Sequence, residues 1–305
     1  MKVVVAGGSG ALGRRLCADL ASAGFEVVVL TRRRRPGPHR QVEWDGRTVG
    51  AWCRELEGSV VVNLAGELVD RRPTAANISL LTTSRVDPTR ALVEGSRRLD
   101  LPVPAWVQAS TLAIYGDAGE TVLDESAPPA DGPPQMAGVA RAWEAAVEGA
   151  NAERLIVLRT GIVLDNDTPA LDRLWGLARW GLGGRVGPGT QWISWVHIDD
   201  WLAIVRAALE PDSQLEGVLH ATGPEPVRNA DLMAALRRSL GRPAAPPTPA
   251  LLVHLGAALL RTDPALALTG RRAVPARLLD SGFRFAHPDL AEALADLRSR
   301  QADKT

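Results

Sequence analysis

Short, mostly apolar runs alternate with longer stretches of helical periodicity along the first half of the chain. Residues 2–6 form the first apolar run and lead directly into a glycine turn. Leucines then recur at the spacing of one helix face, at Leu12, Leu16 and Leu20. Gly24 follows where a left-handed residue ends a helix, and residues 25–30 form a second apolar run. This strand–helix–strand order predicts parallel strands joined by crossover helices.

The alternation continues to about residue 165. Apolar runs predict further strands at residues 59–63, 106–110 and 155–159, and helical periodicity predicts helices at 78–98, 136–149 and 171–179. Beyond that point the pattern loosens, and the glycine-rich stretch 181–189 suits a loop that folds over a substrate. We therefore predict an α/β fold with a Rossmann-type doubly wound parallel sheet over residues 1–165, to which segments of about 190–222 return. A smaller substrate-binding lobe with a C-terminal helical module is expected over residues 166–305.

The glycine turn has the spacing of a dinucleotide pyrophosphate site. Gly7 permits the tight turn, Gly10 lets the backbone approach the phosphates, and Gly13 lets the helix pack closely on the strand. Free N–H groups and the dipole at the start of the helix favour negative charge. The predicted pyrophosphate-binding residues are Gly7, Ser9, Gly10, Ala11, Leu12 and Gly13. A strand–turn–helix unit whose glycines serve packing alone is the alternative.

The residues that end the second strand select the cofactor. An NAD site carries Asp or Glu there for the ribose 2′-hydroxyl, whereas an NADP site carries cations for the 2′-phosphate. This chain has Thr31 followed by four arginines at 32–35, with no acid nearby. We expect Thr31, Arg32 and Arg33 to bind NADP(H), because a guanidinium pairs bidentately with phosphate and stacks on adenine. The last two arginines of the run are expected to be solvated loop charges.

The composition is that of a soluble enzyme. The 35 basic and 35 acidic residues give a formal net charge of zero, and no second cluster like the arginine run supports nucleic-acid binding. The apolar stretch 250–260 is too short to span a bilayer, and we expect no signal peptide because the chain begins with a strand. Cys17 and Cys53 form no C-x-x-C motif, and Cys17 is expected to be a buried small hydrophobe. We expect a cytoplasmic monomer or homodimer with a small-molecule substrate and no nucleic-acid or membrane partner.

Motifs beyond the glycine turn are spread over the whole chain. In the first half they are Asn63-Leu64-Ala65-Gly66, Ser110-Thr111, Tyr115-Gly116 and Asp124-Glu125. With Gly7–Gly13 they resemble an extended short-chain dehydrogenase/reductase. Further motifs are Ser84-Arg85, Trp143-Glu144, Arg159-Thr160-Gly161, His197-Ile198-Asp199-Asp200, Pro226-Val227-Arg228-Asn229, Arg271 to Pro275 and Gly282-Phe283-Arg284-Phe285. With these, the chain is most similar to an atypical branch, the epimerase-family proteins of the SDR39U type, which are NAD-dependent epimerase/dehydratase-like and carry a C-terminal DUF1731-like module.

The resemblance implies a nucleotide cofactor and places more residues around it. It implies that Asn63, Leu64, Ala65 and Gly66 bring the backbone close to the adenine ribose. It also implies that Thr160 and Gly161 lie at the nicotinamide end.

Reductases of this superfamily use a Tyr-x-x-x-Lys dyad, in which the lysine lowers the pKa of the tyrosine and holds the ribose. A free phenol titrates near pH ~10 and is a poor acid–base group at neutral pH without that cation. Counted back from Glu144, the two dyad positions hold Met136 and Ala140, and the only lysines are Lys2 and Lys304. Arginine does not substitute, since its charge is permanent and its shape differs. The standard mechanism is therefore excluded.

Three hydroxyl groups remain as candidates for catalysis, those of Thr111, Ser110 and Tyr115. Thr111 has the spacing of the hydroxyl that binds the substrate oxygen in extended reductases, and Ser110 is its rival. A hydroxyl orients a carbonyl but does not supply a proton at a tuned pKa. Tyr115 becomes a donor only if a cation such as Arg141 or Arg159 stabilises the phenolate. The alternatives are that Ser110 and Thr111 merely end a strand and that Tyr115 is structural.

His197 has an ordinary pKa near neutrality, and we interpret it as structural or pocket-lining, with catalysis as the lesser alternative. Asp199 or Asp200 is expected to cap the following helix. A metal site is not predicted, because adjacent residues rarely converge on an ion and no distant Cys/His set is evident. The nearby tryptophans either line an apolar pocket or pack the joint between lobes; they are Trp192, Trp195 and Trp201.

The sequence thus favours an NADP(H)-dependent oxidoreductase or epimerase-like enzyme that acts on a small carbonyl or hydroxyl compound. Hydride would pass between nicotinamide C4 and a substrate carbon, with a non-standard group or water managing the proton. The alternative is a non-catalytic NADPH-binding protein that senses redox state or scaffolds a partner. The missing dyad favours that alternative, whereas the intact cofactor motif favours the enzyme.

Overall fold

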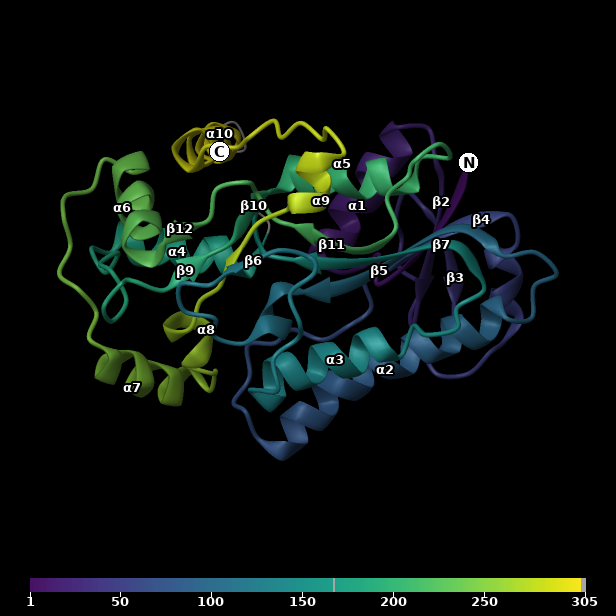
Figure 1. Ribbon diagram of the computed structural model, residues 1–305, viewed down its shortest axis with the longest axis horizontal. Coiled ribbons are helices and arrows are strands. Elements are labelled where there is room, and N and C mark those ends of the chain that lie inside the picture. The colour runs from purple at the N-terminus through teal and green to yellow at the C-terminus, as the bar shows by residue number, and fades with distance from the viewer. Residues whose placement is uncertain (167, 303–305) are drawn as a thin grey trace.

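A parallel sheet of seven strands forms the centre of the computed structural model, which describes residues 1–166 and 168–302 (Figure 1). The strands are β1 (Lys2–Ala6), β2 (Glu26–Thr31), β3 (Arg40–Glu43), β4 (Ser59–Asn63), β5 (Val103–Thr111), β7 (Ala152–Thr160) and β11 (Gly217–Ala221). Their order in the sheet is β11-β7-β5-β4-β1-β2-β3. The chain therefore builds outward from β1 in one direction and then in the other, which confirms the doubly wound fold and puts the switch point between β1 and β4.

The middle residues of the central strands are largely apolar because both faces of the sheet are covered. Residues 3–5 of β1 are fully buried. The register of β1 places Ala6 opposite Leu30 of β2 and opposite Asn63 of β4. The three strands therefore end at the same level, and the loops that follow them meet above the switch point.

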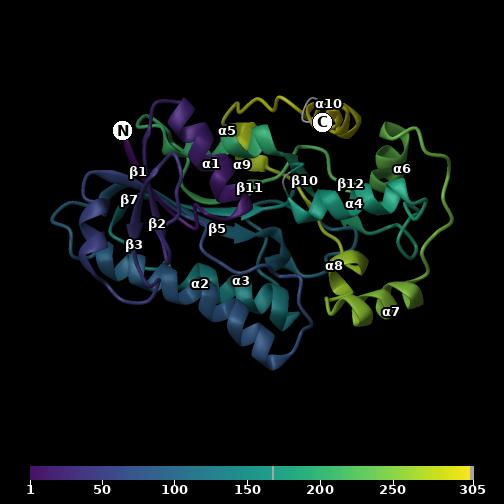
Figure 2. The ribbon, with the colours of Figure 1, turned by 180° about the vertical axis from the view of Figure 1, so that it is seen from behind.

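Helices cover both faces of this sheet and give the molecule three layers (Figures 1 and 2). On one face lie α1 (Ala11–Ser22) and α5 (Ile198–Leu209), which contact each other. On the other face α2 (Ala75–Ser96) runs alongside α3 (Val139–Ala145). Two short 3-10 helices, η1 (Ala51–Leu56) and η2 (Leu112–Tyr115), lie in the connections before β4 and after β5.

The helix predicted at residues 136–149 is shorter and starts differently. Pro134–Gly138 form a π-helical turn, η3, and α3 follows it. The Gly138 N–H donates to the carbonyl of Pro133, five residues earlier, at 3.3 Å. Pro133 and Pro134 have no N–H to donate, so the wider turn is closed by the residues that follow them.

The remaining helices are here called the C-terminal lobe. They are α4 (Pro169–Arg179), α6 (Asn229–Ser239), α7 (Ala250–Leu260), α8 (Ala265–Leu268), α9 (Ala276–Asp280) and α10 (Leu290–Ala302). Most of them lie beside the carboxyl ends of the strands, whereas α9 packs against β11 (Figure 1). Pairs of short strands join the lobe to the rest: β8 (Ile162–Leu164) with β10 (Trp195–His197), β9 (Trp192–Ile193) with β12 (Val227–Arg228), and β6 (Val122–Leu123) with β13 (Arg272–Ala273). Because β6 lies in the loop after β5, the last pair fastens the lobe to that loop.

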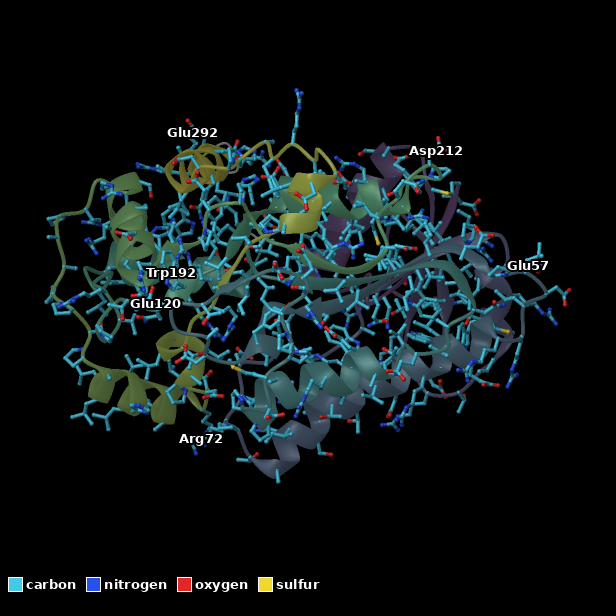
Figure 3. All side chains as sticks on the ribbon, in the orientation of Figure 1. Glu57, Arg72, Glu120, Trp192, Asp212 and Glu292 are labelled. Carbon is cyan, nitrogen blue, oxygen red and sulfur yellow. The ribbon has the colours of Figure 1, made fainter. Side chains whose placement is uncertain are left out.

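The tryptophans near His197 pack the joint between sheet and lobe. Trp195 and Trp201 are buried in the core. Trp192 lies with Glu120 at the outside of the joint (Figure 3), and its Nε1 donates to Glu120 Oε2 at 3.0 Å. The guanidinium of Arg228 stacks 4.0 Å from the centre of the Trp192 ring. Packing of the joint, one of the two interpretations of these tryptophans, therefore accounts for their positions.

The glycine-rich stretch 181–189 forms no helix or strand, as predicted. It packs on the segment that precedes α7: a Cβ at Gly184 would lie 1.8 Å from the carbonyl oxygen of Pro246, and Val186 bridges to Thr248. These contacts hold the stretch within the C-terminal lobe.

The lengths of the apolar helices and the burial of Cys17 were also considered from the sequence. Within residues 1–166 and 168–302, no helix is both long and apolar enough to cross a membrane. Cys17 is buried on α1, and burial raises the pKa of its thiol to about 12. The thiol is therefore protonated at neutral pH and packs as a small hydrophobe, as predicted.

Candidate functional site: a dinucleotide cleft

The glycine turn between β1 and α1 depends on contacts that a side chain would block. Gly7 has a φ of +82°, a left-handed value that favours glycine. The Gly10 N–H donates to the Gly7 carbonyl at 3.0 Å and closes the turn. A Cβ at Gly13 would lie 2.2 Å from the same carbonyl oxygen, so the helix touches the turn directly. Among the described residues, no side chain caps the start of α1, and its N–H groups are available to an anion.

The turn that follows β4, residues 63–66, forms the second wall. The Asn63 side chain is buried and donates to two side chains of neighbouring elements, while its Oδ1 accepts the Ala65 N–H at 3.1 Å. A Cβ at Gly7 would lie 2.6 Å from the carbonyl of Leu64, so the two walls are in contact. The hydrogen bonds of the buried Asn63 side chain therefore fix the conformation of this turn.

A cleft of about 1110 Å³ opens above these turns at the carboxyl ends of β1, β2 and β4. That volume slightly exceeds the ~300–1,000 Å³ of most small-molecule sites, as a dinucleotide requires. The predicted cofactor residues that line it are Gly7, Ser9, Gly10, Thr31, Arg32, Arg33, Leu64, Ala65 and Gly66. The other predicted residues of this half, Ala11, Leu12, Gly13 and Asn63, lie in or behind its walls.

The arginine run forms one side of the cleft. Thr31 Oγ1 accepts the Arg33 N–H at 3.3 Å and donates to the Arg33 carbonyl at 2.9 Å, which fixes the turn after β2. Gln41 binds the backbone of Arg35 through both of its amide atoms, at 2.9 and 2.7 Å. The loop therefore folds back, and Arg35 lines the cleft with Arg32 and Arg33. Arg35 is exposed, as expected of a loop charge, and its place beside the cleft depends on Gln41 of the next strand.

One carboxylate lines the cleft from the turn after β4. Glu67 Oε1 lies 3.7 Å from Arg32 Nη2, and Oε2 lies 3.5 Å from Arg71 Nη2. The acid that an NAD site carries at the end of β2 is absent, since β2 ends at Thr31 and the arginine run follows. Glu67 therefore offsets part of the positive charge without taking the place of that acid.

The ends of β5 and β7 bring the second group of predicted residues together. The register pairs Ser110 with Arg159 and Thr111 with Thr160. Thr111 Oγ1 accepts the Ala113 N–H at 3.1 Å and caps η2, which leaves its own proton free to donate to a ligand. Thr111 thus keeps the chemistry that a substrate-orienting hydroxyl needs.

Thr160 and Gly161, predicted at the nicotinamide end, contact α5 and the segment before β10. Thr160 Oγ1 accepts from Trp201 Nε1 at 3.3 Å. A Cβ at Gly161 would lie 2.7 Å from the carbonyl oxygen of Ser194. The backbone of the two segments is therefore packed closely where sheet and lobe meet.

Tyr115 is buried in a hydrogen-bonded network that links β5, β7, β11 and α3. Arg159 Nη1 donates to the Tyr115 oxygen at 2.6 Å, and Arg159 Nε and Nη2 donate to Glu144 at 2.9 and 2.8 Å. Ser110 Oγ donates to Glu144 Oε1 at 2.5 Å. His220 Nε2 lies 2.7 Å from the Tyr115 hydroxyl.

The direction of these bonds follows from His220. Its Nδ1 lies 2.9 Å from the carbonyl of Val274, which only accepts, so the ring proton is on Nδ1. Nε2 then accepts, and the Tyr115 hydroxyl donates to it. The sequence does not reveal the partners of His220, because Tyr115 lies 105 residues away and Val274 lies 54 residues away.

This environment decides what Tyr115 can do. Burial raises the pKa of the Tyr115 hydroxyl, and the Arg159 charge only partly opposes it. The phenol is therefore protonated at neutral pH, with its proton directed at His220. Of the two cations considered from the sequence, Arg159 contacts the phenol, while Arg141 pairs with Asp131 at 3.1 Å. A structural tyrosine, one of the two interpretations from the sequence, suits these contacts.

The two residues at the dyad positions are packed in the apolar core. Met136 and Ala140 are both buried. Ala140 lies in an apolar cluster with Leu112, Ile114 and Tyr115. The helix face that presents the dyad in related reductases is therefore part of the core here.

His197 lies at the start of α5 and is fully buried. Its Nδ1 accepts the Asp199 N–H at 3.2 Å, so the histidine itself caps the helix. The prediction that Asp199 or Asp200 is the cap is therefore wrong. Asp200 instead accepts two backbone N–H groups of the C-terminal segment, and Asp199 pairs with Arg300 at 2.5 Å. Both carboxylates therefore bind the C-terminal segment. A pattern of neighbouring residues does not reveal contacts with a segment so far away in the chain.

Two distant residues, His287 and Asp296, join His197 and Asp199, and one potential ligand atom from each lies within 4.8 Å of the others. Arg300 supplies the positive charge of this cluster, with Nε 2.7 Å from Asp296 and Nη2 2.5 Å from Asp199. Because His197 Nδ1 accepts a hydrogen bond, the proton of the neutral ring is on Nε2, which faces Asp296 at 3.1 Å. The cluster is therefore an ion-pair network between α5 and α10.

This network makes stability depend on pH. Burial and the neighbouring His287 charge lower the pKa of His197 from 6.5 to about 4. Between those values the unfolded chain binds a proton that the folded protein does not, so stability falls as the pH falls. We expect the free energy of unfolding in urea to drop by up to about 1.4 kcal/mol per pH unit from this group. His197→Asn, which keeps a capping side chain, is expected to flatten the profile. Equal slopes for both proteins would contradict this assignment.

Comparison with known proteins gives the family. Residues 3–142 match the NAD dependent epimerase/dehydratase family, and residues 248–297 match a domain of unknown function, DUF1731. The epimerase family protein SDR39U1 of Bos taurus is 34% identical over 302 residues, which cover 97% of this chain and 99% of the relative. The epimerase family protein ML0860 of Mycobacterium leprae is 33% identical over 303 residues, which cover 98% and 96%.

Solved structures agree with these relatives. The crystal structure of human epimerase family protein SDR39U1 (isoform 2) with NADPH has a TM-score of 0.86 at 30% identity and covers 98% of this chain and 99% of that one. MoeE5 in complex with UDP-glucose and NAD has a TM-score of 0.76 at 22% identity over the whole of both chains, which shows the fold alone. The resemblance drawn from the motifs is thereby confirmed, and the chain belongs to the epimerase family of SDR39U1-type proteins, with an N-terminal NAD-dependent epimerase/dehydratase region and a C-terminal DUF1731 region.

Proposed function

We propose that this protein is an NADP(H)-dependent oxidoreductase or epimerase-like enzyme that acts on a small carbonyl or hydroxyl compound without a Tyr-x-x-x-Lys dyad. The observation that carries the proposal is the row of three arginines in the cleft, Arg32, Arg33 and Arg35. In this family, human SDR39U1 has been solved with NADPH, which agrees with that cofactor.

The residues of the cleft fit such a cofactor. The glycine turn leaves space that a Cβ would fill, and the uncapped start of α1 offers N–H groups to a pyrophosphate. Arg33 and Arg35 would hold the 2′-phosphate, while Arg32 is shared with Glu67. NADPH, when bound, supplies a hydride from its nicotinamide ring.

Among the hydroxyls at the nicotinamide end, Thr111 suits contact with a substrate oxygen. Its Oγ1 accepts the Ala113 N–H and still has a proton to donate. The Ser110 proton is directed at Glu144, and the Tyr115 proton at His220. We therefore infer that Thr111 orients the substrate and that the proton of the reaction comes from water.

Binding of the two nicotinamide cofactors tests the proposal. Titration of tryptophan fluorescence is expected to show a preference for NADPH over NADH of about tenfold or more, equivalent to ~1.4 kcal/mol. The variant Arg33→Ser/Arg35→Ser is expected to lose most of this preference with NADH affinity nearly unchanged. Arg98→Ser, an exposed residue of the segment after α2, is the matched control and should behave as wild type. Equal affinity of the wild type for both cofactors would contradict the assignment of the arginines.

A non-catalytic NADPH-binding protein is the second candidate, favoured by the buried phenol of Tyr115 and the apolar packing of Ala140. Loss of NADPH absorbance in the presence of aldehydes and ketones distinguishes the two. For the enzyme we expect turnover that falls about 100-fold or more in Thr111→Ala, the usual effect of losing one hydrogen-bond donor to a reacting oxygen. Unchanged turnover in that variant would remove Thr111 from the mechanism, and tight NADPH binding without turnover would favour the second candidate.

A further inference from the structure

We propose that Arg85 of α2 binds the nicotinamide-side half of NADP(H), at the ribose and the adjoining phosphate, where a dyad lysine acts in reductases with the complete motif. This inference rests on the proposed cofactor. It concerns binding and positioning only, because a permanently charged guanidinium exchanges no proton at neutral pH.

Hydrogen bonds hold the Arg85 guanidinium in one place. Nη2 donates to the Glu67 carbonyl at 2.9 Å, and Nη1 donates to the Leu81 carbonyl at 3.1 Å. A longer contact of 3.4 Å joins Nη1 to Ser84 Oγ. Cζ lies 5.1 Å from the centre of the Trp143 ring. The side chain thus bridges the turn after β4 and helix α3.

The charge of Arg85 lacks a dedicated partner. Among the described residues, Glu67 is the one carboxylate that acts on it, and the Glu67 oxygens pair with Arg32 and Arg71 instead. Burial lowers the pKa of Arg85 to about 10, so the side chain remains charged at neutral pH. These hydrogen bonds use three of the five N–H groups of the guanidinium, which leaves two. A largely buried cation is costly unless an oxygen-rich or anionic group completes it.

Arg85 lies against the wall of the cofactor cleft. Gly66 lines the cleft, and a Cβ there would lie 3.2 Å from Cζ of Arg85. The guanidinium therefore lies beside the backbone of Gly66, at the edge of the cleft. A side chain at position 66 would meet the Arg85 side chain.

The position within the sheet selects the nicotinamide half. α2 follows β4 and α3 follows β5, so a side chain between these helices lies on the β5 side of β4 (Figures 1 and 2). The arginine run follows β2, on the opposite side of the switch point. A dinucleotide whose 2′-phosphate lies at the arginine run extends its other half across the switch point towards β5. That half passes Arg85.

The packing of α3 explains why a residue of α2 supplies the cation. Ala140, at the lysine position, lies in an apolar cluster with Leu112. Trp143 lies three residues later on the same helix and turns towards Arg85. A cation at this place in the cleft therefore comes from the neighbouring helix.

Two ligands that share the adenine half provide the test. NADPH carries the nicotinamide half, and adenosine 2′,5′-bisphosphate lacks it. We expect Arg85→Met to weaken NADPH binding about tenfold or more, the effect of losing hydrogen bonds to a charged group. Its affinity for adenosine 2′,5′-bisphosphate is expected to change by less than about twofold. Arg85→Lys retains the charge and is expected to recover part of the NADPH affinity.

Arg90→Met is the matched control, because Arg90 is exposed on the same helix, and it should retain both affinities. Thermal unfolding monitors the fold of each variant, and Arg85→Lys alone carries the comparison if Arg85→Met does not fold. Unchanged NADPH affinity in the Arg85 variants would overturn the assignment. An equal loss for both ligands would also overturn it, since Arg85 would then support the cleft as a whole. Wild-type protein that binds neither ligand would instead overturn the proposed function.

Discussion

Replacing Arg159 with methionine is expected to lower the free energy of unfolding by about 3–5 kcal/mol, the usual cost of leaving a buried charge without its partner. Arg159 is 4% exposed and donates to both oxygens of Glu144. In the variant the Glu144 carboxylate retains only the Ser110 hydroxyl, and Tyr115 loses a donor. Methionine fills similar volume but donates no hydrogen bond. Urea unfolding followed by tryptophan fluorescence at neutral pH measures the loss.

Two further variants separate the buried charge from other effects. The double variant Arg159→Met/Glu144→Leu removes both charges and is expected to recover much of the stability, because an apolar pair often replaces a buried ion pair without loss. Arg98→Met breaks an exposed pair with Glu94 and should cost less than about 1 kcal/mol. A loss as small as that for Arg159→Met would mean that the Tyr115 network does little to stabilise the fold.

Gly13→Ala is expected to weaken NADPH binding at least about 100-fold and to lower stability by about 1–3 kcal/mol. The added Cβ would lie 2.2 Å from the Gly7 carbonyl oxygen and 2.7 Å from the Gly8 Cα. Both are backbone atoms of the turn, so α1 must move away from β1 to admit a methyl group. That movement separates the N–H groups of the turn, which have to converge on one pyrophosphate. NADPH titration and urea unfolding measure the two effects.

Gly176→Ala provides the control for the Gly13 variant. Gly176 lies within α4, and a Cβ there meets no atom within 4 Å. Alanine favours a helix over glycine by roughly 0.5–1 kcal/mol, so this variant should be at least as stable as wild type and bind NADPH equally. Full NADPH affinity in Gly13→Ala would favour the alternative in which the glycines serve packing alone.

The strands were predictable because each is specified by its own residues. The run predicted at residues 59–63 is β4 without change, and β5 and β7 extend the predicted runs by a few residues at their ends. Gly24 ends the first helix with a φ of +85°, as its position indicated. A strand buried on both faces needs a continuous apolar run, which neighbouring residues alone supply.

The cofactor side was predictable in outline and incomplete in detail. The glycine turn and the start of the arginine run line one cleft. Arg35 is exposed as expected, but its place beside the cleft was not predicted, because it depends on Gln41, which binds its backbone from β3. From the sequence, Arg85 was identified only as part of a family motif, without a role. Its closeness to Gly66 arises from the packing of α2 against the turn after β4.

The sequence by itself determined the parallel sheet, the glycine turn, the basic end of β2 and the absence of the dyad, since each is a property of consecutive residues. Only the tertiary structure decided the partners of Tyr115 and His197. Tyr115 is surrounded by Arg159 and His220, which come from other strands, and the carboxylates beside His197 are taken by the C-terminal segment. Burial and charge at a site depend on distances between segments far apart in the chain, and those distances are set by how helices pack on the sheet.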